Sequence, residues 1–335
     1  MSININSLNC LMDLHIHLDG SLSLNSAKHL AEIQNIILPD NDFDLKNLLS
    51  VSNDCKDLNE YLEKFDFPVK LLQTREAIEF AFHNLADELA AQGLMYAEIR
   101  FAPQKHTLNG LSQRDVVSAA IDGLQKSSLD ASLILCCMRD ADNMNDNIET
   151  VILAKDFLNN GVVAVDLAGA EALFPNEQFD YVFSLANELN IPLTIHAGEA
   201  DGPKSVYSAI DYGAKRIGHG VRSAEDDNLI QILSDKKITF ECCPTSNLNT
   251  QVFSSISDFP IKKFIENDVR FTINTDNTAV SDTNLKNEWQ LIIDTFNLTY
   301  SDIRNILQNT VNASFADDAL KSKLYEKINK AFEQI

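Results

Sequence analysis

The stretch "LMDLHIHLDG", residues 11–20, ends an apolar run with two histidines, His15 and His17, placed two positions apart. Alternate residues of a β-strand point to the same face, so a strand over 11–17 would present both imidazoles on one side. Such a pair suits two ligands of one metal ion, but two ordinary hydrogen-bonded histidines show the same spacing. A metal site is the better interpretation only if further candidate ligands lie at the ends of other predicted strands.

Similar short runs rich in β-branched and apolar residues recur along the chain. Together with the first they lie at 11–17, 94–101, 132–138, 162–169, 192–198, 216–220, 238–244 and 269–276. Most are separated by stretches with helical periodicity, which favours parallel strands joined by crossover helices. This order predicts an α/β fold, a (β/α)8 TIM barrel of about 250 residues plus insertions. A doubly wound open sheet is the alternative, although no G-x-G-x-x-G motif follows any strand.

The segment 21–93, between the first two strands, is too long for one crossover helix and predicts a helical insertion. We expect one barrel domain over 1–335 with this lid-like insertion at about 21–93. Within it, "LNEYLEKF" places apolar side chains along one helix face, at Leu58, Tyr61, Leu62 and Phe65. The stripe either packs onto the barrel or covers the mouth of a pocket, because the insertion leaves the C-terminal end of a strand.

Composition excludes several classes of partner. The 335 residues are 45% hydrophobic, and 49 acidic against 27 basic residues give a net charge of −22, which disfavours nucleic acid and anionic membranes. The first residues lack a signal-peptide pattern, and no apolar run has the length of a membrane span. Six cysteines without a C-x-x-C motif predict buried thiols, and no metal ligands, in a reducing compartment. A cytoplasmic location follows as an expectation; the oligomeric state stays open.

Three more polar residues stand where predicted strands finish. His196 is in "TIHAGE", His219 in "RIGHG" and Asp276 in "NTD". The C-terminal ends of barrel strands form the face on which such folds carry out chemistry, so five candidate site residues converge there. The remaining three of the seven histidines lie in helical or loop stretches and are expected to pack or to face solvent: His29, His83 and His106.

The motifs "DLHIHLDGSL", "DLAGAE", "TIHAGE", "RIGHG" and "NTDN", in this order and spacing, resemble the adenosine deaminase family. The similarity extends through "YLEKFDFP" and "YAEIRFAPQ" and so covers nearly the whole chain. It implies hydrolysis of the 6-amino group of adenosine, and of 2′-deoxyadenosine, to give inosine and ammonia in purine salvage. The substrate class would be a small purine nucleoside. The family's ligands for one Zn²⁺ per chain match His15, His17, His196 and Asp276.

The same resemblance implies the catalytic roles. Zinc lowers the pKa of a water molecule, to about 7 in favourable sites, and Asp276 could also accept a hydrogen bond from that water. His219, not needed as a ligand, would orient or deprotonate the water or stabilise its charge. Glu199 would protonate purine N1, which requires a pKa raised by burial. Taken alone, Glu199 could be a solvated loop carboxylate, but its place next to "HAG" disfavours that interpretation.

The resemblance also implies contacts with the substrate. The backbone N–H of Gly169 would meet purine N3, and Asp19, next to His17, would meet the ribose. Relatives that act on free adenine resemble "HLEG" at this point, so Asp19 favours a nucleoside. Asn277 departs from the many family members that carry a second aspartate contacting purine N7. An asparagine amide can still donate there, but the exact purine preference stays open.

Two further pairs of polar residues are predicted to lie near the site. Glu98 and Arg100 are alternate residues of the second predicted strand, and we expect them to form an ion pair behind the metal site. Ser246 and Asn247, in "CCPTSNLNT", either line the site or cap a loop.

Other functions are compatible with parts of the same sequence pattern. They are deamination of another 6-aminopurine compound, such as adenine or an aminofutalosine-type nucleoside, and a non-catalytic protein stabilised by zinc, which would have no use for Glu199. A two-metal hydrolase would carry a lysine at the end of the fourth strand, and "VVAVDLAG" has none. An AMP deaminase needs cationic groups for phosphate, which the acidic balance disfavours. Three histidines and an aspartate also suit divalent ions other than zinc.

Overall fold

Eight parallel strands form the centre of the molecule in the computed structural model, which describes residues 3–5, 8–52 and 54–333. The strands are β1 (Leu11–His17), β2 (Leu94–Phe101), β3 (Ala131–Arg139), β4 (Val162–Gly169), β5 (Thr194–Ala197), β6 (Arg216–His219), β7 (Thr239–Cys242) and β8 (Arg270–Ile273). They pair in chain order as two halves, β1-β2-β3-β4 and β5-β6-β7-β8.

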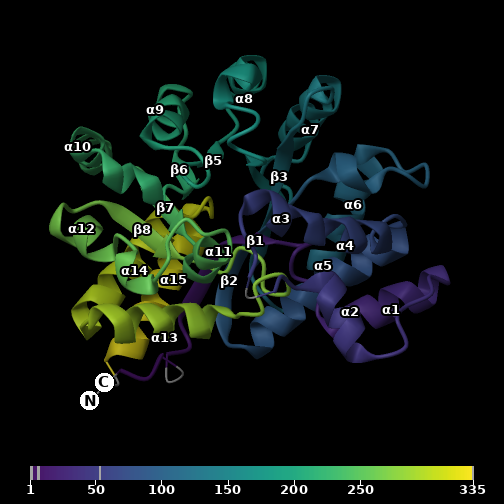
Figure 1. Ribbon diagram of the computed structural model, residues 1–335, viewed down its shortest axis with the longest axis horizontal. Coiled ribbons are helices and arrows are strands. Elements are labelled where there is room, and N and C mark those ends of the chain that lie inside the picture. The colour runs from purple at the N-terminus through teal and green to yellow at the C-terminus, as the bar shows by residue number, and fades with distance from the viewer. Residues whose placement is uncertain (1–2, 6–7, 53, 334–335) are drawn as a thin grey trace.

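Both seams between the halves are closed by backbone contacts. At one seam Ile16 bridges Asp276 in parallel, and the Asp276 N–H donates to the His15 carbonyl at 2.8 Å. At the other, Val165 bridges Leu193. The strands therefore form a closed barrel ringed by helices (Figure 1), which confirms the predicted TIM barrel and excludes the open sheet.

Helices after the strands cover the outside of the barrel. These are α6 (Gln113–Leu124), α7 (Met144–Asp156), α8 (Asp180–Glu188), α9 (Pro203–Asp211), α10 (Asp227–Lys236), α12 (Ile261–Glu266), α13 (Leu285–Phe296), α14 (Tyr300–Ala313) and α15 (Asp318–Phe332). The short helix α11 (Pro244–Asn249), directly after β7, instead lies at the C-terminal end of the barrel, where the Ser246 hydroxyl donates a hydrogen bond to Asp276. The core lies between strands and helices, where buried strand positions such as Ile217 and Phe240 meet the buried faces of the helices.

The segment between β1 and β2 folds into helices. It contains α1 (Leu24–Gln34), α2 (Asp42–Leu49), α3 (Leu58–Leu62), a 3₁₀ turn η2 (Glu63–Phe65), α4 (Asp66–Leu71) and α5 (Arg75–Ala91). Side chains of Ser23, Asn41, Asp57 and Thr74 accept a backbone N–H at the starts of α1, α2, α3 and α5. The longest of these helices, α5, returns the chain to β2, as a crossover helix does.

Several strands end earlier than the apolar runs that predicted them. The runs 192–198, 216–220, 238–244 and 269–276 contain strands of only four residues each. At the ends of these runs the backbone leaves the extended region, with φ of +61° at His219 and +63° at Asp276. In the last run the residues after the strand therefore carry a candidate site side chain, Asp276, instead of continuing the sheet, whereas His196 and His219 still belong to β5 and β6.

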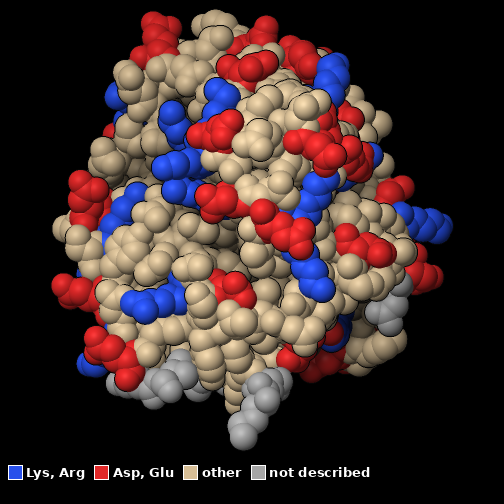
Figure 2. Space-filling view, turned by 90° about the vertical axis from the view of Figure 1, so that its left-hand side faces the viewer, with Lys and Arg blue, Asp and Glu red and all other residues tan. Residues whose placement is uncertain are grey.

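The sequence also predicts the burial of the cysteines and the places of the three histidines outside the site. All six cysteines are buried and unpaired, as expected. His106 is buried, whereas His29 is exposed, and His83 pairs with Asp87 near the surface. In the part of the chain that the structure describes, no helix has the length and apolar character needed to cross a membrane. Figure 2 shows acidic and basic side chains interspersed over the side of the barrel where α10 and α12 lie.

Candidate active site

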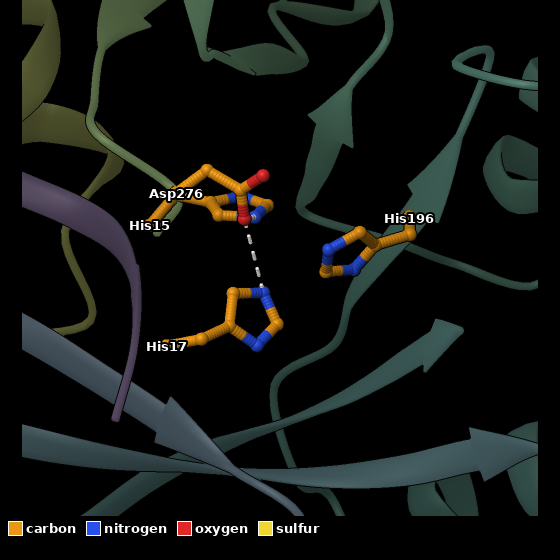
Figure 3. Close-up of side chains that lie close together, drawn as sticks. All are labelled: His15, His17, His196 and Asp276. Atoms are coloured by element: carbon orange, nitrogen blue, oxygen red, sulfur yellow. Dashed lines mark ion pairs between the residues drawn. The ribbon is translucent and has the colours of Figure 1, made fainter. Parts of the chain in front are cut away.

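Four side chains predicted as metal ligands converge at the C-terminal end of the barrel (Figure 3). His15 and His17 project from β1, His196 from β5, and Asp276 follows β8. One potential ligand atom of each lies within 4.8 Å of the others. The Nε2 atoms of His15 and His17 are 3.3 Å and 3.4 Å from Asp276 Oδ1. Three imidazoles and one carboxylate in this arrangement suit a single divalent ion.

Buried carboxylates orient two of these imidazoles. His15 Nδ1 lies 2.7 Å from Glu241 Oε2, and His196 Nδ1 lies 2.9 Å from Asp166 Oδ2. Burial alone would raise the pKa of both carboxyls, but Arg100 and the imidazoles hold each pKa below its usual value. With Nδ1 occupied by a carboxylate, the Nε2 atom of each ring is the one left for a ligand.

The candidate acid and base lie next to each other beside this cluster. His219 Nε2 is 3.5 Å from Glu199 Oε2, and the Asn247 amide is 3.1 Å from His219 Nδ1. Burial, followed by the charges of Asp276 and Glu171, raises the pKa of Glu199 well above its ordinary value. Burial lowers the pKa of His219 to about 3. These shifts favour the protonated form of Glu199 and the uncharged form of His219, which are the forms that a general acid and a base require.

A cavity of about 480 Å³ joins these groups to the residues assigned to substrate. Its walls include His17, Asp19, Gly169, Asn277 and Glu199. The cavity is large enough for a small organic ligand and combines apolar walls with a few polar groups, as ligand sites do.

Three residues in this wall have a side-chain polar atom that is buried without a partner among the described residues, and one of them is Arg139, at Nε; the other two are residues assigned to the substrate. These two are Asp19, at Oδ1, and Asn277, at Oδ1, and burial raises the pKa of Asp19 to about 6. A Cβ on Gly20 would lie 1.7 Å from Asn277 Oδ1, so the glycine of "HLDG" is required by the placement of Asn277. Gly169 has a φ of +110°, so its glycine is required by the backbone conformation.

A family model described as adenosine deaminase matches residues 10–331 of the chain. The chain belongs to the adenosine deaminase family. It is 45% identical over 334 residues to the adenosine deaminase of Haemophilus ducreyi, covering 97% of each protein. It is 39% identical over 326 residues to that of Enterococcus faecalis, covering 96% of each. The predicted family and enzyme class, a metal-dependent hydrolytic deaminase, are confirmed.

Solved structures of similar proteins have the same fold. Arabidopsis ADAL complexed with IMP superposes with a TM-score of 0.87 at 26% identity, covering 98% of each chain. The adenine deaminase of Arthrobacter aurescens superposes with a TM-score of 0.86 at 23% identity, covering 97% of this chain and 99% of that one. At that identity the second comparison establishes the fold alone.

The apolar stripe of the insertion faces the site of this family member. Leu58, Tyr61, Leu62 and Phe65 all line the cavity, and the Phe65 ring lies 6.4 Å from the His17 ring, centre to centre. Tyr61 is buried, and its hydroxyl is 2.7 Å from Ser281 Oγ in the chain that follows β8. These side chains therefore form part of the wall of the cavity.

The predicted ion pair between Glu98 and Arg100 is wrong. Arg100 Nη1 and Nη2 are each 2.7 Å from a carboxylate on a strand that is not adjacent to β2, Asp166 on β4 and Glu241 on β7. Glu98 pairs instead with Arg216 Nη1 at 2.6 Å. Alternate residues of one strand project side by side, and each therefore reaches across the barrel to another strand. Arg100 does lie behind the metal site, where it joins the two carboxylates that orient His15 and His196.

Ser246 and Asn247, on α11, both reach toward the site. Ser246 Oγ donates to Asp276 Oδ2 at 2.6 Å, which fixes the rotation of that carboxylate. Sequence reasoning did not find Asp166, Glu241 or Glu171. The available signal was a carboxylate within or just after an apolar strand run, in "VAVDLAGAE" and "TFECC". Buried carboxylates of this kind need cationic or hydrogen-bonding partners, which here are the arginines, the imidazoles and backbone N–H groups.

Proposed function

We propose that the protein hydrolyses the 6-amino group of adenosine and 2′-deoxyadenosine, releasing inosine or deoxyinosine and ammonia. The observation that carries this proposal is the buried cluster of His15, His17, His196 and Asp276 beside Glu199 and His219 in one cavity. The name of the Haemophilus relative, adenosine deaminase, supports the same substrate.

The metal proposed for this cluster is one zinc ion. His15 Nε2 is buried without a hydrogen-bond partner among the described residues, as expected of a ligand atom facing a metal position. Three neutral nitrogens and one carboxylate match the ligands that zinc prefers. Bound there, zinc would supply a water molecule acidic enough, with a pKa of about 7, to attack near neutral pH.

The side chains of the protein supply the proton transfers. Glu199, in its protonated form, transfers its proton to purine N1 as C6 is attacked, so that the ring can accept electron density. His219, uncharged and adjacent, orients the attacking water and takes its proton, while Asp276 accepts a hydrogen bond from it. The C6–O bond forms, the proton taken by His219 passes to the amino group, and the C6–N bond breaks to release ammonia. The new C6 hydroxyl then loses its proton, which restores Glu199 to its protonated form and leaves the carbonyl of inosine.

Other residues of the wall would hold the nucleoside. We assign the free carboxylate oxygen of Asp19 to a ribose hydroxyl and the backbone N–H of Gly169 to purine N3. Asn277 Oδ1 lies against Gly20, so the amide nitrogen is the end available to donate to N7. His17, which is proposed as a ligand and also as a contact of the substrate, lines the same wall.

Nucleotide substrates are the second candidate. The related Arabidopsis ADAL was solved with IMP, and two lysines here, Lys70 and Lys105, line the cavity. The carboxylate of Asp19 at the ribose position repels a 5′-phosphate, however, and favours the uncharged nucleoside.

We also propose that residues 21–93 act as a lid-like cover within a single barrel domain. The six unpaired thiols suit a reducing compartment, and we place this purine salvage step in the cytoplasm.

A substrate panel tests the proposal. Zinc-loaded protein would be assayed by ultraviolet absorbance and ammonia release with adenosine, deoxyadenosine, adenine, AMP and an aminofutalosine-type nucleoside. We expect adenosine and deoxyadenosine to have the highest kcat/KM, and chelation followed by zinc addition to abolish and restore turnover. Preference for adenine or AMP would overturn the nucleoside assignment, and no turnover of any compound would overturn deamination.

A further inference from the structure

One buried carboxylate holds the turn that carries Glu199. Four successive backbone N–H groups, those of residues 198–201, donate to Glu171 at N···O distances of 2.6, 3.0, 2.7 and 3.0 Å. The hydroxyl of Ser205 adds a fifth donor at 2.6 Å. Glu171 is 1% exposed, so these bonds are largely shielded from water.

The backbone of this turn depends on that acceptor. Gly198 has a φ of +70°, and a Cβ there would lie 2.5 Å from Val206 Cγ2, so the chain turns sharply where β5 ends. The turn directs its N–H groups at Glu171, which follows β4, and so ties the ends of two neighbouring strands together. A carboxylate has about four acceptor sites on two oxygens, whereas an amide side chain accepts through one oxygen alone. Buried backbone donors left without an acceptor here would destabilise this conformation of the turn.

Glu171 is not among the residues that line the cavity of about 480 Å³ assigned to the substrate, whereas Glu199 is. Glu171 lines a second cavity of about 380 Å³ that shares Glu199 with the first. Because the five hydrogen bonds that its carboxylate accepts from the described residues come from the turn and from Ser205, we expect its effect on turnover to pass through the turn and its charge.

We infer that Glu171 is a positioning residue for the reaction, which fixes the turn 198–201 so that the Glu199 carboxyl is held beside His219. The inference rests on the proposed function, in which Glu199 protonates the purine.

The negative charge of Glu171 also favours the protonated form of Glu199. Asp276 and Glu171 both disfavour ionisation of Glu199, while Arg139 opposes them and Thr250 donates to its carboxylate. His219 is the other titratable group facing Glu199. Removing the charge of Glu171 therefore lowers the pKa of Glu199 and moves the alkaline limb of kcat to lower pH.

Three variants test the inference in the zinc-loaded enzyme. Glu171→Gln removes charge and one acceptor, and Glu171→Asp keeps the charge but shortens the reach. Glu177→Gln is the control, a carboxylate farther along the same connection that is 47% exposed and lies 3.4 Å from Lys204. Steady-state kcat, KM and the pH profile of kcat would be measured, with zinc content and thermal unfolding checking integrity.

The three variants are expected to distinguish the effect of Glu171 on the position of the turn from the effect of its charge. Glu171→Gln lowers kcat by about 10²-fold with little change in KM, and its alkaline limb shifts to lower pH. Glu171→Asp also lowers kcat, but its limb stays where the wild-type limb lies. Glu177→Gln behaves as wild type.

Distinct results would overturn the inference. Wild-type kcat in Glu171→Gln contradicts it, as does a reduced kcat with an unshifted limb, which is what a merely structural role gives. If Glu171→Gln does not fold, wild-type kcat in Glu171→Asp contradicts it. Activity retained in Glu199→Gln would instead contradict the proposed function, so the two failures are distinguishable.

Discussion

Gly20 and Asn277 show how tightly single residues are fitted in this site. Gly20→Ala would place a methyl group 1.7 Å from Asn277 Oδ1, so Asn277 must move. We expect a rise in KM for adenosine, because the proposed N7 contact is displaced, and a loss of about 1–3 kcal/mol in stability from overpacking. Steady-state kinetics and urea unfolding measure the two effects.

Gly202→Ala is the matched control, since the nearest atom to a Cβ at Gly202 is 3.8 Å away. The double variant Gly20→Ala/Asn277→Ala should regain the lost stability without regaining the KM. Unchanged KM and stability in Gly20→Ala would contradict the fitted contact.

Individual residues differ in how well their place in the site could be predicted from the sequence. The convergence of four histidines and an aspartate could be predicted because the ends of barrel strands meet on one face, whereas the choice of four of them as metal ligands rested on the family resemblance. Glu241 and Asp166 were missed because a carboxylate inside an apolar strand does not disclose which of several neighbours it faces. The wrong pairing of Glu98 with Arg100 has the same origin, since the partners lie on other strands.

At the scale of elements, α3 and η2 supply an apolar wall to the cavity. Phe65→Ala would remove a ring that lines the pocket near His17. We expect KM for adenosine to rise about tenfold, with a smaller change in kcat, because apolar contact with the bound ligand is lost. Kinetics with adenosine measure this effect.

Glu63→Ala, an exposed position in the same turn, serves as the control and should leave KM unchanged. An unchanged KM in Phe65→Ala would show that the stripe packs on the barrel without meeting substrate.

The helix α13 contains a buried carboxyl, Glu288, which accepts hydrogen bonds from the Thr245 N–H and the Thr283 hydroxyl. Burial raises its pKa from 4.5 to about 7. The folded state therefore holds a proton that the unfolded state releases, so stability falls as pH rises from about 4.5 through 7. This contribution is on the order of 3 kcal/mol.

Glu288→Gln removes that titration, so its free energy of unfolding should fall less between pH 5 and pH 7.5, about the limits of this window, than that of wild type. Urea unfolding at both pH values measures the difference, with exposed Glu326→Gln as the control. Equal pH dependence in Glu288→Gln and wild type would contradict the assignment.

Element boundaries were less predictable than element order. The run 94–101 matches β2 in full, whereas the run 269–276 contains β8 only over Arg270–Ile273. The extra residues carry site side chains in turns, and apolar patterning does not distinguish a strand from the buried turn that follows it.

At the scale of the whole molecule, the proposed metal connects the two halves of the barrel. Its ligands come from β1 in one half and from β5 and the end of β8 in the other. An ion that binds only the folded state stabilises it by mass action. We expect chelated protein to unfold at a lower temperature, and one equivalent of zinc to restore the Tm.

His196→Ala tests the connection, because it removes the ligand on β5. Its Tm should respond weakly to chelator and to zinc. The same response in His196→Ala as in wild type would place the stabilising ion elsewhere.

The most direct test of deamination by this site compares wild type with Glu199→Gln, both carrying measured zinc. Glu199 lies beside His219 in the cavity but is not among the four proposed ligands, so its replacement should leave zinc content intact. We predict that adenosine is converted to equal amounts of inosine and ammonia, and that kcat falls by about 10²- to 10⁴-fold in the variant. Undiminished turnover in zinc-loaded Glu199→Gln, or none in zinc-loaded wild type, would contradict the account.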